Sequence, residues 1–142
     1  MIHDTELLQY VYKTADMGCT GIQSVLDYTQ SAPLKDKLKD QYKEYSDLRK
    51  QAQTLLQVRQ EPPAGADILA KVSTDFMAAG KMMVDHSDSK IAEMTIQGNQ
   101  MGVNKTIKHL HDYSGQNDSA RALAEKLLAT EQANAEQLKS FL

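Results

Sequence analysis

One carboxylate lies where the sequence predicts the interior of the protein, and it has the clearest potential for chemistry. On a helical wheel of roughly 100° per residue, Glu131 lies near the middle of an apolar stripe close to the end of the chain. A buried carboxyl group must be hydrogen-bonded, paired, protonated or bound to a metal ion, because burying a bare charge costs several kcal/mol. Two interpretations stay open. In the first, Glu131 belongs to a polar core network with Gln41, Tyr45 or Tyr12. In the second, Glu131 binds a metal ion or a proton.

Three further carboxylates lie at the edges of apolar helical faces. Asp16 is near Cys19 along the first predicted helix. Glu44 borders the apolar face of the second helix, and Glu93 flanks that of the third. Most carboxylates in proteins are at the surface, so we expect these three to be boundary or solvated charges. Cys19 falls on an apolar stripe and is expected to be a buried, unreactive thiol.

The elements that must position these residues are helices. Apolar residues recur at three- and four-residue spacing along four long stretches and one shorter stretch, which predicts amphipathic helices. In chain order, with the shorter stretch third, they span residues 4–30, 34–61, 65–85, 90–113 and 117–142. The short turn after the first helix makes the first two antiparallel neighbours. We therefore expect a single all-α domain over residues 1–142, an antiparallel four-helix bundle with a helical crossover between the second and third bundle helices.

The stretch 90–113 carries two apolar stripes, which implies two neighbours. The first stripe comprises Ala92, Ile96, Val103, Ile107 and Leu110, and the second comprises Ile91, Met94, Gly98 and Met101. We expect the first stripe to face the bundle core and the second to face the crossover helix. If the crossover covers the second stripe imperfectly, the remaining patch should bind a symmetric copy. The sequence thus predicts a homo-oligomer, specifically a dimer.

Glycine and methionine add to this packing prediction. Gly98 and Gly102, with Gly18 and Gly21 on the first helix, lower helix propensity and so suggest compensation by close helix contact. The methionines gather on the crossover and on the neighbouring side of the third bundle helix, at Met77, Met82, Met83, Met94 and Met101. At helical spacing, methionines form core or interface more often than copper or haem sites.

Composition excludes several classes of function. The chain has 142 residues, a length typical of one domain, and its 41% apolar and 25% charged residues argue against disorder. The formal charge of −3 arises from interleaved acidic and basic residues, so we expect no nucleic-acid partner. A single cysteine, and the lack of a signal-peptide or membrane-span pattern, predict a cytoplasmic protein without a membrane partner.

The layout of two long helical hairpins joined by one long connection resembles the ferritin-like superfamily. More specifically, the segments 12–18 (YKTADMG), 91–98 (IAEMTIQG) and 124–128 (AEKLL) resemble a group of small uncharacterised bacterial ferritin-like proteins of clostridial type. Active members of this superfamily hold two iron or manganese ions. Their ligands are a Glu from each of two helices and a Glu-x-x-His from each of the other two.

The resemblance implies a ligand set in this chain. Its carboxylates would be Asp16, Glu44, Glu93 and Glu131, and the position of one family histidine falls on Asn134, a weak ligand for iron. No histidine follows Glu44 at the required spacing either, and the four histidines lie at the terminus or toward helix ends, at His3, His86, His109 and His111. We therefore expect no complete di-metal centre and no cofactor, while iron or manganese at a carboxylate-rich site stays open.

Two functions follow from these observations. The first is a structural or interaction protein that self-associates, with any other protein partner unidentified and no catalytic role. The second is a metal-dependent oxidase, peroxidase or iron-binding protein with a non-standard carboxylate site. Metal content after purification would separate the two hypotheses.

Overall fold

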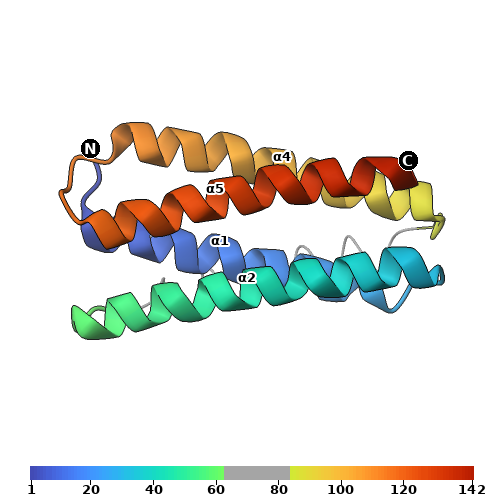
Figure 1. Cartoon of the computed structure of the whole chain (residues 1–142), viewed down its shortest axis with the longest axis horizontal. Helices are drawn as coiled ribbons and strands as arrows, with labels where there is room; N and C mark the ends of the chain where they lie inside the picture. The colour runs from blue at the N-terminus through green and yellow to red at the C-terminus, as the bar shows by residue number, and fades with distance from the viewer. Residues whose placement is uncertain (63–83) are drawn as a thin grey trace.

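Four long helices run side by side through the part of the chain that the structure describes, residues 1–62 and 84–142 (Figure 1). In this computed structural model the helices are α1 (Asp4–Leu26), α2 (Ala32–Val58), α4 (Asp88–Asp112) and α5 (Asp118–Leu138), and the short 3₁₀ helix η1 (Lys139–Phe141) follows. The described ranges contain no β-strand. The predicted all-α four-helix bundle is confirmed. The predicted crossover helix, with its methionines, lies almost entirely outside the described residues.

Side-chain caps begin three of the four helices. The hydroxyls of Ser31 and Ser87 and the amide oxygen of Asn117 accept hydrogen bonds from backbone N–H groups three residues later, at 3.4, 3.2 and 2.9 Å. Each cap satisfies a donor that has no partner within the helix. Helix α1 differs, because its N-cap residue is His3, which makes no side-chain capping hydrogen bond. Asp4 is the first helical residue. At this position the negative charge of the Asp4 carboxylate interacts favourably with the positive end of the helix dipole.

The chain forms two helical hairpins. Helix α1 packs against α2, and α4 packs against α5 (Figure 1). Helix α5 also contacts α1 and α2, whereas α1 and α4 contact each other much less. The core between the hairpins is filled mainly by leucines that are at most 1% exposed, at Leu7, Leu8, Leu34, Leu38, Leu48, Leu56, Leu127 and Leu138. The looser packing of α1 against α4 leaves space along the seam between these two helices.

The apolar stripe of α1 faces this core. On α1, Val11, Ala15, Cys19 and Ile22 are all buried. Cys19 is a free thiol, and burial raises its pKa, as expected for an unreactive cysteine. None of the described helices combines the length and apolarity needed to cross a membrane.

The N-terminus is fastened to the turn between α4 and α5. The backbone N–H of Ile2 donates to the carbonyl of Asp112 at 3.0 Å, and that of Ser114 donates to the carbonyl of Ile2 at 3.0 Å. The hydroxyl of Tyr113 donates to the carboxylate of Asp4. These bonds join the start of α1 to the end of α4, so the seam between the two helices is held together at this end of the bundle.

Candidate functional site

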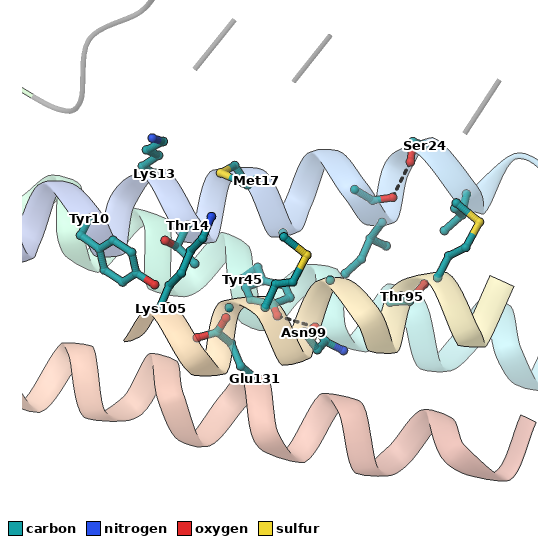
Figure 2. Close-up of a pocket in the computed structure, with 18 of the residues that line it drawn as sticks. Tyr10, Lys13, Thr14, Met17, Ser24, Tyr45, Thr95, Asn99, Lys105 and Glu131 are labelled. Atoms are coloured by element: carbon teal, nitrogen blue, oxygen red, sulfur yellow. Dashed lines mark hydrogen bonds between the residues drawn. The ribbon is translucent and has the colours of Figure 1, made fainter. Parts of the chain in front are cut away.

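A cleft of about 560 Å³ lies between α1 and α4 (Figure 2). Tyr45 of α2 and Glu131 of α5 reach it from the other two helices. Most of the lining is apolar, and its charged side chains lie toward one end and in the middle, while Ser24 and Thr95 lie toward the other end (Figure 2). The cleft is therefore an apolar trough with a few convergent polar side chains, which is the usual composition of a ligand pocket.

The polar end of the cleft is built by the first turns of α1 and the last turns of α4. The rings of Tyr10 and His109 stack across the seam with their centroids 3.7 Å apart. The Nδ1 atom of His109 lies 2.8 Å from the carbonyl oxygen of Lys105, one helical turn earlier. The exposed Lys105 side chain extends from α4 toward Thr14 on α1, and Lys13 of α1 also lines the cleft (Figure 2).

Glycines determine how closely side chains approach the middle of the cleft. A Cβ atom on Gly18 would lie 2.7 Å from Cγ of the Tyr45 ring, and one on Gly102 would lie 1.6 Å from Oε2 of Glu131. These two glycines thus permit close approach, as the sequence predicts. Gly98 differs, since a Cβ atom there would meet no atom of the described residues within 4 Å. Its missing side chain leaves open space in the cleft.

Glu131 ends a chain of hydroxyl groups that crosses three helices. Its side chain is buried, with only 2% exposed. Its Oε1 atom accepts a hydrogen bond from Thr106 at 2.8 Å, and the Thr106 Oγ1 atom lies 2.9 Å from the hydroxyl of Tyr10. With the Thr106 proton donated to Glu131, the Tyr10 hydroxyl donates to Thr106. The carboxyl group therefore has a hydrogen-bonded partner, as a buried polar group requires.

Burial raises the pKa of Glu131 to about 7, and the hydrogen bond from Thr106 opposes this rise in part. Desolvation disfavours the charged form of the acid, which is why it dominates here. Burial also raises the pKa of Tyr45, with a smaller contribution from the charge of Glu131. The floor of the cleft therefore holds a carboxylic acid that changes its protonation near neutral pH.

A second polar group lies beside Glu131 in the bundle interior. The hydroxyl of Tyr45 donates to Oδ1 of Asn99 at 2.9 Å, while Nδ2 of Asn99 has no acceptor among the described residues. The fully buried Asn134 lies beside the same hydroxyl, and its backbone carbonyl accepts from Gln41 at 3.3 Å. Gln41 and Tyr45 are two of the predicted partners of Glu131. Their described hydrogen bonds are made to other residues.

The other predicted carboxylate ligands lie apart from this network. Asp16 accepts a hydrogen bond from Arg49 at 2.7 Å in a half-buried ion pair. Glu44 is exposed, and its pKa is raised by partial burial and then by the neighbouring charge of Asp40. Glu93 is exposed and lies 3.6 Å from Lys90.

Within residues 1–62 and 84–142, no three His, Cys, Asp or Glu side chains lie close enough to hold one metal ion. The backbone carbonyl of Asn134 accepts a hydrogen bond from Gln41, and its side chain lies beside the Tyr45 hydroxyl. Asn134 therefore does not lie in a cluster of carboxylates. The donor set that the ferritin-like resemblance implied is therefore not assembled in this part of the chain.

Thr106, Asn99 and Tyr10 were not predicted as site residues from the sequence. The spacing of Asn99 and Thr106 could have indicated their burial. The buried residues of α4 and its C-cap include a series that recurs every seven positions, at Ala92, Asn99, Thr106 and Tyr113, beside the buried Ile91 and Val103. The predicted core stripe instead included Ile96 and Ile107, which are half-buried. A seven-residue repeat that includes polar residues would have indicated a polar seam in the bundle. Nothing in the sequence indicated the contact between Tyr10 and Thr106.

Comparisons with known proteins identify the fold of the chain. No known family profile matches the sequence, and no curated protein matches it. Among solved structures, the crystal structure of a DUF305 fragment from Deinococcus radiodurans is similar, with a TM-score of 0.70 and 14% sequence identity. The match covers 96% of this chain and 93% of the other chain. At this identity, the similarity extends to the fold alone.

The expected membership of the ferritin-like superfamily is wrong, because the structural match is to a DUF305 domain. Two antiparallel hairpins joined by a long connection follow from helix length and loop length, and several groups of bundle proteins share them. The short segments that carried the resemblance lie on helical faces where apolar and small residues recur for packing reasons. The chain has the four-helix fold of the DUF305 fragment, and the ligand set inferred from the ferritin-like proteins loses its basis.

Proposed function

We propose that this bundle is a binding protein that takes a small apolar ligand into the cleft between α1 and α4. The observation that carries the proposal is an apolar cleft of about 560 Å³ with a buried, hydrogen-bonded acid in its floor. Pockets for small molecules span roughly 300–1,000 Å³ and combine apolar walls with a few polar groups. A perturbed acid in such a cleft is also typical of functional sites.

A non-catalytic role fits the surroundings of Glu131 best. Its pKa of about 7 would suit a general base. However, its described hydrogen-bond partner is the neutral hydroxyl of Thr106, and the thiol of Cys19 is buried with a raised pKa. The described residues offer no activated nucleophile beside the acid. The proposal therefore extends the interaction role inferred from the sequence and assigns no reaction to the chain.

The alternative, a metal-dependent oxidase, peroxidase or iron-binding protein, has weaker support. It requires several carboxylates at one place, whereas Asp16 is paired with Arg49 and Glu93 lies near Lys90. Iron or manganese binding stays a prediction of the sequence, and the Glu131 variant in the Discussion tests it. A cytoplasmic location likewise remains a proposal, based on the single free cysteine.

Gly98→Leu should block the cleft and weaken binding of an apolar ligand about tenfold, a loss of roughly 1.4 kcal/mol. Among the described residues, a Cβ atom at this position would meet nothing within 4 Å, so we expect leucine to project into the cleft. The measurement is a fluorescence titration with the neutral, apolar dye Nile red. Gly98→Ala is the matched control, because it adds one methyl group and should leave the dissociation constant almost unchanged.

A saturable Nile red site that Gly98→Leu weakens would support the proposal, whereas wild-type protein without such a site would contradict it. In the second case, a second copy of the chain would be the remaining occupant to test.

Self-association remains a prediction of the sequence and competes for the same surface. Three members of the second stripe of α4, which suggested a dimer, line the cleft, namely Met94, Gly98 and Met101, whereas Ile91 is buried in the core. Met101 is 60% exposed. Sedimentation equilibrium at high micromolar concentration tests the prediction directly. Monomer alone would contradict the dimer. A dimer that Gly98→Leu dissociates would identify a second copy, rather than a small molecule, as the occupant.

A further inference from the structure

We propose that the ligand of the cleft is a long-chain carboxylate, whose head group binds Lys105 and whose apolar tail follows α1 and α4. The inference rests on the proposed binding function and names the class of ligand. It is carried by the placement of the Lys105 side chain at one end of a trough whose lining is mostly apolar.

The head group would bind at the polar end of the cleft. The Lys105 side chain extends across the seam toward α1 (Figure 2), and it forms no ion pair with any carboxylate in the described residues. The hydroxyls of Thr14 and Tyr10 line the cleft on the facing helix. A carboxylate can accept hydrogen bonds from an ammonium group and from hydroxyls together, and such charge-assisted bonds are stronger than neutral ones.

Glu131 does not cancel the charge of Lys105. It is the acidic residue among those that line the cleft. Its buried carboxyl group is bound to Thr106, and burial raises its pKa to about 7. The group therefore carries its proton in a large fraction of molecules at neutral pH. An anion bound nearby would favour that protonated form further.

The tail would run away from Lys105 along the apolar part of the trough. Toward the other end, the lining consists mainly of apolar and glycine residues, at Met17, Gly18, Gly21, Ile22, Val25, Met94 and Gly98. The helix axis from Thr14 to Val25 extends over roughly 16 Å, at about 1.5 Å per residue. An elongated trough whose lining includes Lys105 and Lys13 at one end is complementary to an amphiphile, and less so to a compact carboxylate.

Calorimetric titrations of the full chain with decanoate and with decanol test the inference, since these probes share a tail and differ in charge. We expect wild-type protein to bind decanoate more tightly than decanol. Lys105→Gln should weaken decanoate binding about tenfold, the typical effect of losing a charge-assisted hydrogen bond, and leave decanol binding unchanged. Lys108→Gln, which removes another exposed charge from α4 outside the cleft lining, is the matched control.

The outcomes separate this inference from the proposed function. Equal binding of both probes, unaffected by Lys105→Gln but weakened by Gly98→Leu, would overturn the carboxylate preference and leave an apolar ligand site. An equal loss of decanoate binding in Lys108→Gln would also overturn it, because the effect would then come from net charge. If neither probe nor Nile red binds, both the inference and the proposed function are wrong.

Discussion

Glu131→Gln should make the protein more stable above about pH 7 and change its stability little below about pH 4.5. The acid has a pKa near 4.5 when solvated and about 7 in the folded protein. Between these values the folded state binds more protons than the unfolded state, so the free energy of unfolding falls as pH rises. The full cost, roughly 3 kcal/mol at about 1.4 kcal/mol per pKa unit, is reached above pH 7.

Glutamine removes this cost because it cannot ionise. Its amide oxygen can still accept the hydrogen bond from Thr106, so the neutral form of the network is kept. Urea unfolding of both proteins across this pH range, followed by circular dichroism, measures the difference. Glu125→Gln is the matched control, since it removes an exposed carboxylate from the same helix.

The same variant decides whether Glu131 is a metal ligand. If it is, purified wild-type protein should contain stoichiometric iron or manganese, and Glu131→Gln should lose it. The variant would also lose any rise in melting temperature that added metal produces, because ligand binding stabilises the folded state. Loss of metal from the variant, together with a variant that is less stable than the wild-type protein above pH 7, would contradict the polar-network interpretation. It would favour the alternative function.

The fold was largely predictable because each bundle helix buries one continuous stripe, and burial of that kind leaves a periodic trace in the sequence. The burial of Glu131 was predictable for the same reason, since its position on the wheel depends only on its own helix. It is 2% exposed, as expected. Cys19, on the stripe of α1, was placed correctly by the same argument.

The partners of Glu131 were not predictable, because they depend on the rotation and offset of neighbouring helices. Thr106 lies on α4 and Tyr10 on α1, and nothing in the spacing of either helix fixes their contact with α5. The cleft was missed for a related reason. Glycine indicates close approach where a neighbour fills the space, as at Gly102, but it indicates open space where no neighbour is present, as at Gly98.

Those two glycines, four residues apart on α4, should respond in opposite directions to the same substitution. Gly98→Ala should stabilise the protein by up to about 1 kcal/mol, since alanine has the higher helix propensity and its Cβ atom meets nothing within 4 Å. Gly102→Ala should destabilise it by roughly 1–3 kcal/mol, because its Cβ atom would lie 1.6 Å from Oε2 of Glu131 and must displace the carboxyl group. Urea unfolding of both variants measures the two effects.

A second substitution shows whether the carboxyl group causes the loss at Gly102. In a Glu131→Ala background the clashing atoms are absent, so Gly102→Ala should lose most of its cost, and the double variant should be more stable than additivity of the single changes predicts. Gly98→Ala should keep its full benefit in that background, since it does not contact Glu131. If Gly102→Ala were as stabilising as Gly98→Ala in the wild-type chain, the carboxyl group could not lie against α4 at this point. The hydrogen bond between Thr106 and Glu131, on which the cleft floor depends, would then be wrong as well.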